Sequence, residues 1–298
     1  MSYKSPKWNN GSAPPLSAEN MQALTDAVQE QGETLATMCN PNMLDNWYFG
    51  NPVNQRGQTS YTGTDTYTID RWLTDNTVTV VDGGIVVKRT GYNALFYQYL
   101  EDSLVEAIAG RVVTYSALTT DGLMTVTTKL PPSQSSDWDT DNAVQGDLTL
   151  DIIKSVAGKI YIRFYSTVVG TEATIIAVKL ELGTQQTLAH QDTDGNWVLN
   201  EIPKFGNQLA ECQRYCVAFN KYDCFLPVDT NDFVVELPVP MRATPTIINP
   251  QNIINANVTN PTVAWYNIGS NQLRLRSTAS HGGLQTVCDG LVLFSADL

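Results

Sequence analysis

The sequence predicts a mainly β protein: an N-terminal arm and helix, a jelly-roll β-sandwich, a second short helix and a smaller C-terminal β-sandwich. Hydrophobic residues form 42% of the 298-residue chain and charged residues only 16%, so much of the polar surface has to come from uncharged side chains. Apolar residues alternate with a period of two over most of the chain, and Gly and Asx turns separate these runs. The length allows two domains and a short extension.

Residues 1–16 are predicted to form an arm that has no core of its own. They contain Trp8, an Asn9-Asn10-Gly11 turn and Pro14-Pro15, but no periodic apolar pattern. A segment of this kind is suited to binding in a partner. The candidate anchor residues are Trp8, Asn10 and Gly11.

Residues 17–41 are predicted to form a heptad helix that begins with Ser17 as its N-cap. The a and d positions hold five apolar residues and one glutamine: Met21, Leu24, Val28, Gln31, Leu35 and Met38. A lone helix with one narrow apolar stripe is marginal, so we expect it to form a coiled coil with helices of identical chains, in which Gln31 fixes the register and the number of strands. The alternative is a helix that folds back onto its own domain.

Residues 42–190 are predicted to form the jelly roll. The runs Thr77–Val81 and Ile85–Lys88 flank Asp82-Gly83-Gly84, which is typical of a tight hairpin. Six further strand-like runs follow, over 96–100, 112–117, 123–129, 148–153, 159–165 and 173–182. About eight short strands suit one sandwich, and residues 101–109 suit a short helix.

Residues 191–298 are predicted to form a helix and a C-terminal β knob. An Asx- and Gly-rich turn over 191–196 marks the boundary. A helical stripe follows Asn200, with spacings of 4, 3, 4 and 3 residues between Phe205, Leu209, Cys212, Cys216 and Phe219. Five strand-like runs then follow, over 233–237, 246–248, 263–266, 272–276 and 291–295.

The composition argues against nucleic-acid and membrane partners. The chain has 18 basic and 30 acidic residues, a net charge of −12, which repels nucleic acid. It has no run of 18 apolar residues and no apolar region at its start, so we expect synthesis in a cytoplasm without a secretory signal. The five cysteines are unevenly spaced and lack paired CxxC motifs, which favours buried, reduced thiols over disulfides or a zinc site.

The sequence contains few residues that could activate a catalytic nucleophile. Only His190 and His281 supply imidazole groups, and no GxSxG motif is present. We therefore expect a protein that is not an enzyme. The alternative is a glycan hydrolase in which Asp137 or Asp139 belongs to an acid pair.

The acidic loop over 137–141 is the one candidate for a metal site. Asp137, Asp139 and Asp141 alternate like the first ligands of a calcium loop. Asn142 and Leu148 then replace the glycine and the glutamate that such a loop uses. Calcium is thus a weak candidate, and no other cofactor is expected.

Aromatic residues give the candidate glycan-binding sites. The chain has 6 Trp, 13 Tyr and 8 Phe, and flat amphipathic rings beside polar side chains suit the C–H faces and hydroxyl groups of sugars. The candidates are Tyr92, Asn93, Tyr97, Trp138, Asp139, Trp265 and Tyr266. The alternative for each aromatic ring is a place in the core, because one face of a sandwich strand is always buried.

Short motifs along nearly the whole chain resemble one protein family. The motifs at 8–11 and 16–21 resemble an N-terminal anchor. Those at 46–49, 51–57 and 67–72 resemble the opening of a carbohydrate-binding-like jelly roll, and Lys179–Gly183 resembles its closing strand. Those at 209–215, 238–242 and 245–246 resemble the entry of a terminal knob. These are parts of the tail-fibre and receptor-binding proteins of bacteriophages and prophages.

The resemblance implies a homotrimer in the tail fibre or baseplate of a virion, attached to the particle through its N-terminus. It also implies non-covalent attachment to a bacterial surface polysaccharide. Cys216 stands where the family often has an aromatic residue, and the long repetitive β-helix of depolymerase spikes is absent. The shared motifs look structural, so no receptor-binding residue is carried over. The alternative within a virion is a baseplate or tail-tip protein without host contact.

Overall fold

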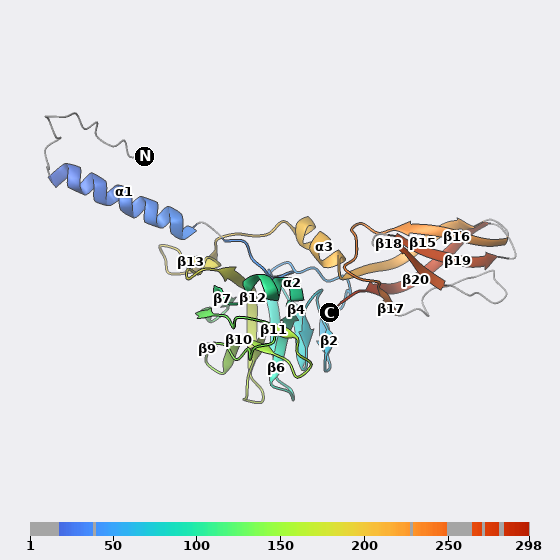
Figure 1. Ribbon diagram of the computed structural model, residues 1–298, viewed down its shortest axis with the longest axis horizontal. Coiled ribbons are helices and arrows are strands. Elements are labelled where there is room, and N and C mark those ends of the chain that lie inside the picture. The colour runs from blue at the N-terminus through green and yellow to red at the C-terminus, as the bar shows by residue number, and fades with distance from the viewer. Residues whose placement is uncertain are drawn as a thin grey trace.

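A computed structural model shows a mainly β chain that extends from a lone helix, through a sandwich, to a slender C-terminal unit (Figure 1). It describes residues 18–37, 40–226, 229–248, 264–269, 272–279 and 283–297. The prediction of a mainly β fold is confirmed, because among these residues antiparallel sheets make up most of the regular structure and three short helices the rest. The anchor candidates Trp8, Asn10 and Gly11 lie outside the described residues, as does Met38. No helix in the described ranges is long and apolar enough to cross a membrane.

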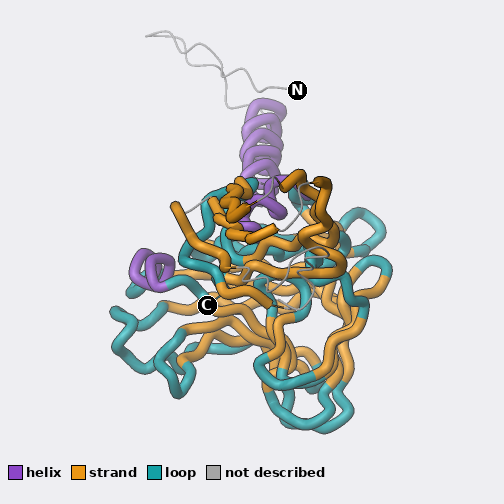
Figure 2. The backbone as a smooth tube through the Cα atoms, turned by 90° about the vertical axis from the view of Figure 1, so that its right-hand side faces the viewer, coloured by secondary structure: helices purple, strands orange, loops and turns teal. Residues whose placement is uncertain are grey.

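Helix α1 (Ala18–Thr37) stands away from the sandwich, as two perpendicular views show (Figures 1 and 2). Its described apolar stripe is open to solvent: Met21 is 49% exposed, Leu24 46% and Val28 61%. The helix therefore does not fold back onto its own domain. An isolated helix of this length gains too little from its own hydrogen bonds to be stable in water.

The sandwich consists of two six-stranded antiparallel sheets. The first has the order β1 (Ser60–Thr62), β4 (Thr77–Val81), β5 (Gly84–Lys88), β12 (Glu172–Leu182), β7 (Val112–Thr119) and β8 (Gly122–Lys129). The second has the order β2 (Thr66–Tyr67), β3 (Leu73–Thr74), β6 (Ala94–Tyr99), β11 (Ile160–Tyr165), β10 (Leu148–Lys154) and β9 (Ala143–Gln145). Helix α2 (Asp102–Ile108) forms where the short helix was predicted.

An aromatic cluster fills the space between the two sheets. The rings of Trp72 and Phe96 stack 4.6 Å apart, and Phe49 meets both edge-on, the arrangements that ring quadrupoles favour.

The predicted hairpin is confirmed, with β4 and β5 joined at Val81 and Gly84. Glycine is needed at position 84 for β5 to lie against β12, because a Cβ there would lie 2.7 Å from the carbonyl oxygen of Ile175.

The Asx- and Gly-rich turn predicted over 191–196 joins the two strands of a hairpin. Strand β13 (Ala189–Gln191) pairs with β14 (Trp197–Leu199), and Asp192 accepts backbone hydrogen bonds from Asp194 and Asn196 within the turn. Short polar side chains that bond to the following backbone favour such turns.

Helix α3 (Phe205–Gln213) follows, but it is shorter than the predicted stripe. Its last turn is tightened by bonds from the amides of Arg214 and Tyr215 to carbonyls three residues earlier. Cys216 and Phe219, which were predicted to continue the helix, belong to strand β15 (Cys216–Leu226). The alternating run that begins at Tyr215 suits a strand better than a helix.

The C-terminal unit contains two three-stranded sheets. One has the order β15, β20 (Gly283–Ser295) and β17 (Thr246–Ile248), and the other β16 (Asp229–Glu236), β19 (Gln272–Ala279) and β18 (Ala264–Gly269). Strands were predicted at each of these positions except β15.

The C-terminal unit is fastened to the sandwich by an aromatic and ionic contact. The guanidinium of Arg71 lies 3.6 Å from the ring centre of Tyr215, and the Tyr215 hydroxyl donates to Glu101. Gln55 Nε2 also donates to the carbonyl of Cys216 at 2.6 Å. We call this contact the junction.

Candidate functional site

The sandwich has two unlike ends. Helix α1 and the junction both lie at one end, where Asn40 Nδ2 donates to the carbonyl of Leu182 and Met43 N to that of Leu180. At the other end, Lys88 pairs with Glu172 and Thr119 with Ile175. The loops there are 89–93, 120–121, 146–147 and 166–171, and we call them together the free end. It is remote from both flanking parts of the chain (Figure 1).

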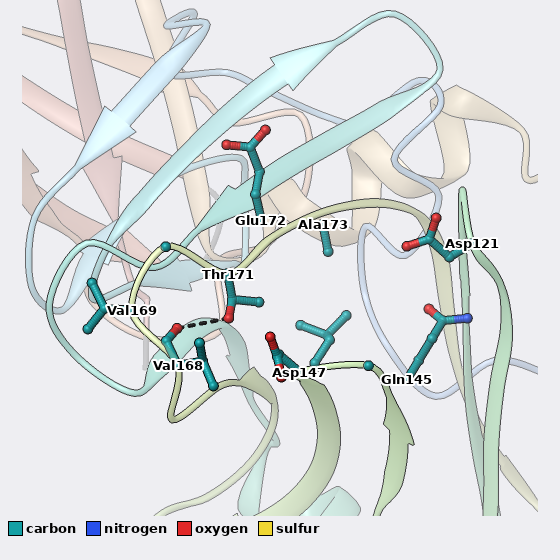
Figure 3. Close-up of a pocket in the computed structure, with 11 residues that line it drawn as sticks. Asp121, Gln145, Asp147, Val168, Val169, Thr171, Glu172 and Ala173 are labelled. Carbon is teal, nitrogen blue, oxygen red and sulfur yellow. Dashed lines mark hydrogen bonds between the residues drawn. The ribbon is translucent and has the colours of Figure 1, made fainter.

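The free end contains an open pocket of about 480 Å³, a size usual for small-ligand sites. Figure 3 shows Asp147 and Gln145 on one side and the loop of Val168, Val169 and Thr171 on the other. Thr171 Oγ1 donates to the Val168 carbonyl at 2.8 Å, which closes this loop on itself. The pocket wall is therefore formed by short turns held on strand ends.

Three carboxylates line the pocket, from Asp121, Asp147 and Glu172. Glu172 is neutralised by Lys88 at 2.8 Å, although both side chains are about half exposed. Asp121 and Asp147 are exposed and make no ion pair among the described residues. Their oxygens are thus available to accept hydrogen bonds from a ligand.

An exposed indole lies beside this pocket. Trp197 is 37% exposed, and its Nε1 lies 3.4 Å from where a Cβ on Gly122 would be. Gln145 Nε2 lies 3.6 Å from the same point, and Gly122 has a φ of +125°, so any other residue would be strained there. The turn at Gly122 therefore allows an aromatic ring and an amide to approach each other at the pocket margin.

The neighbouring loop, 89–93, is held rigidly by two buried polar side chains. Arg89 donates to the Thr167 carbonyl at 2.8 Å and to Asn93 Oδ1 at 2.7 Å. Asn76 donates to the carbonyl of Tyr92 at 2.9 Å and accepts from the amide of Gly91. The loop presents Tyr92, which is 59% exposed, on a fixed backbone.

A second aromatic surface lies on the outer face of β6 and β11. The rings of Tyr97, Tyr99 and Tyr161 are 5.5 to 5.7 Å apart, and Arg163 lies 4.4 Å from the ring centre of Tyr165. We call these four tyrosines with Arg163 the tyrosine face. Register explains it, because alternate residues of β11 point outward while Ile162 and Phe164 fill the core.

The charge on the tyrosine face is largely balanced. Asp151 binds Arg163 through two bonds of 2.8 and 3.0 Å. Although burial lowers the pKa of Arg163, this pairing with Asp151 raises it overall, so the guanidinium stays charged. Burial, together with hydrogen bonding to Asp65, raises the pKa of Tyr97 far above its ordinary value, so that hydroxyl stays protonated.

The structure divides the predicted glycan-binding residues. Tyr92 and Asn93 lie at the free end and Asp139 is exposed. Trp265 and Tyr266 lie on β18, but their side chains are outside the described residues.

For two of the predicted residues, the expected exposure of the aromatic ring is wrong. Trp138 is 0% exposed and Tyr97 is 3% exposed. Trp138 closes the sandwich core and donates from its indole to the Ser133 carbonyl at 3.0 Å, so the loop folds inward despite its flanking acids. Tyr97 lies beneath its neighbours Tyr99 and Tyr161.

The candidate calcium residues do not form a ligand set. No group of three or more acidic, His or Cys side chains within the described ranges is placed to hold a metal. Of the three candidate ligands, Asp141 has a carboxylate that accepts from Thr128 Oγ1 at 2.8 Å.

The histidine and cysteine expectations concern residues that the structure covers only in part. His190 is exposed on β13 and bonds to Asn200, while His281 lies outside the described residues. Cys212 and Cys216 are free and buried, and burial raises the pKa of the Cys216 thiol to about 12. For these two, the prediction of buried, reduced thiols is confirmed.

Three features of the site were missed in the sequence: Trp197, the clamp formed by Arg89 and Asn76, and the tyrosine face. A signal existed for the last, since Tyr161, Arg163 and Tyr165 alternate on one predicted strand. The approach of Trp197 to Gln145 joins residues far apart in the chain and leaves no local pattern.

Comparisons with protein-family models, with curated proteins and with solved structures give no match to this chain.

Proposed function

We propose that this protein is a non-enzymatic receptor-binding fibre of a phage tail, or of a related contractile particle, that attaches to a bacterial surface polysaccharide. The observation that most supports it is the open pocket at the free end, which Asp121 and Asp147 line, with the exposed indole of Trp197 near the adjacent Gly122. The proposal also draws on the family resemblance of the motifs in the sequence.

The pocket has the groups that a sugar requires. Asp121 and Asp147 would accept hydrogen bonds from pairs of sugar hydroxyls, and the amide of Gln145 would both donate and accept. The indole of Trp197 would contact the apolar face of a pyranose ring. Because loops and walls are fixed by Arg89 and Thr171, little order has to be gained on binding.

The tyrosine face provides a second surface of the same chemistry. Tyr161 and Tyr165 are four residues apart on one strand, so they span about 13 Å. Arg163 between them is already paired with Asp151, which suits contact with a largely uncharged saccharide chain.

The exposed stripe of α1 supports assembly as a homotrimer. Met21, Leu24 and Val28 would be buried only between helices of identical chains. We propose that residues 17–41 form this coiled coil, that residues 1–16 attach to the baseplate or tail of the virion, and that the C-terminal unit is the knob. Three weak glycan sites on one trimer would then give avidity gains of about 10² to 10⁴.

The test is adsorption of the purified full chain to candidate host cells and to a glycan array. We expect Asp147→Asn to reduce glycan binding at least tenfold, because a bidentate carboxylate contact is lost. Asp82→Asn is the matched control, since Asp82 is an exposed acid in a turn outside the pocket, and an Asn-Gly turn is equally favourable.

Two results would contradict the proposal. Equal loss of binding in both variants would show that the pocket is not the site. Failure of the full chain to adsorb to any host surface, combined with its incorporation in the particle, would favour a baseplate protein without host contact.

A further inference from the structure

A buried ionic cluster at the junction has no part in the proposed glycan site. The guanidinium of Arg56 binds Asp70 of the sandwich at 2.8 Å and Asp297, just after β20, at 2.9 Å. The three side chains are 8%, 1% and 4% exposed. One cation thus joins a carboxylate of each β unit in a place that water hardly reaches.

The cluster has one negative charge too many. Asp70 Oδ2 accepts from the backbone amide of Gln55 at 3.2 Å, and Asp297 Oδ2 accepts from Ser295 Oγ at 2.8 Å. Asp297 Oδ1 is buried and has no hydrogen-bond partner among the residues that the structure describes. Burying an uncompensated charge and an unpaired acceptor is costly, so this cluster is under electrostatic stress when both acids are ionised.

The other groups around Asp70 do not relieve that stress. Cys212 of α3 and Cys216 of β15 face it, and burial holds the pKa of both thiols so high that they stay neutral. Burial likewise raises the pKa of Tyr61 on β1. The nearby guanidinium of Arg71 is paired with Asp45 at 2.9 Å.

We propose that Arg56, Asp70 and Asp297 form a proton-operated latch, in which uptake of one proton by Asp70 tightens the contact between the sandwich and the C-terminal unit. With Asp70 neutral, Arg56 and Asp297 remain as a balanced buried pair. With Asp70 ionised, the excess charge favours opening of the junction. The latch does not depend on glycan binding, because the pocket lies at the opposite end of the sandwich.

The direction of the pH effect follows from the environment of Asp70. Burial raises its pKa to about 6, and Asp297 adds to this, against the opposing effects of Arg56 and Gln55. An acid whose pKa is higher in the closed state than in the open state stabilises closure below the ordinary value and loses that effect as the pH rises through 6. The junction is therefore tightest in mild acid and loosest at neutral pH.

The test is hydrogen exchange of the full chain at pH 5.0 and 7.5, corrected for the intrinsic exchange rate. Peptides covering Ala218 report opening, since its amide donates across the junction to Gln55 Oε1 at 3.4 Å. We expect the opening constant to be about tenfold larger at pH 7.5 than at pH 5.0, the change that a pKa shift from about 4 to about 6 produces between these values.

One variant should abolish this pH dependence and a second should weaken it. Asp70→Asn mimics the protonated acid, and Asp297→Asn removes the second carboxylate, which raises the pKa of Asp70 less than burial does. Glu101→Gln is the matched control at the same junction. Although partial burial raises it, the pKa of Glu101 is lowered overall by Tyr215 and three arginines, so Glu101 keeps its charge over this range.

The proposal is overturned if wild-type opening is equal at the two pH values or greater at pH 5.0, or if both asparagine variants keep the tenfold change. If Asp70→Asn does not fold, the proposal is tested instead by the pH dependence of Asp297→Asn and by a carboxyl ¹³C titration of Asp70. A midpoint near 6 supports the latch, and a midpoint below about 4.5 contradicts it. Loss of glycan binding in pocket variants leaves all these outcomes unchanged.

Discussion

Arg89 shows how one buried side chain can fix a surface. Its guanidinium is bonded to backbone carbonyls of Gly91, Tyr92 and Thr167 and to the side chain of Asn93. The residue is only 8% exposed, so these bonds are shielded from competing water. The shape of the free end is thereby decided by a residue that no ligand would contact.

We expect Arg89→Met to lower the free energy of unfolding by about 3 kcal/mol, because several buried carbonyls lose a charged donor. Chemical denaturation measures this change. Lys88→Met is the control, since its exposed pair with Glu172 is worth less than about 1 kcal/mol. Equal destabilisation by the two substitutions would refute the role given to Arg89.

Among the elements, helix α1 stands apart from the rest of the described chain. Its described stripe is about half exposed, and each leucine buried between helices contributes about 2 kcal/mol. The described part of a single chain therefore leaves this heptad stripe uncovered.

We expect Leu24→Asn to destabilise the trimer by about 6 kcal/mol, since the loss of about 2 kcal/mol recurs in each of three chains. Sedimentation equilibrium would show dissociation at micromolar concentration. Ala23→Asn places the same side chain one residue away, on an exposed position off the stripe, and should leave the assembly intact. A wild-type monomer would contradict the assignment of α1.

Elements with a strong local period were predictable, and those decided by contacts far along the chain were not. The hairpin of β4 and β5 and the strand β17 were found because alternation and turn residues agree. The end of α3 was misplaced, because its apolar spacing continues into a strand that pairs with β20. Trp138 was misjudged because neighbouring acids suggest exposure, whereas its burial depends on a core that the sequence does not show.

The same division holds for the site. Tyr92 and Asn93 were predicted because aromatic and amide residues adjoin in a turn, and the structure leaves both exposed. Asp121 and Asp147 line one pocket because β7 and β10 lie in facing sheets. No spacing in the sequence predicts that arrangement.

At the scale of the whole molecule, three parts follow one another along the chain: helix α1, the sandwich and the C-terminal unit. The sandwich is bonded to the chain before it through Asn40 and Met43, and it has a continuous core of its own. Its stability should therefore be independent of α1.

We expect deletion of residues 1–39 to leave the sandwich folded, with a melting temperature within a few degrees of the full chain, because Asn40 and the core are kept. Circular dichroism and calorimetry test this. The same deletion should abolish trimer formation and incorporation into particles. Loss of the folded sandwich would show that α1 packs on it in the assembled protein.

Both flanks of the chain meet the sandwich at one end, and this has a consequence for how such a protein can change. Residues may be exchanged or inserted in the loops 89–93 and 166–171 without touching the assembly helix or the ionic contact at the other end. Substitutions in these loops can therefore reshape the surface that one end of the sandwich presents, while the contacts that hold the rest of the chain stay as they are.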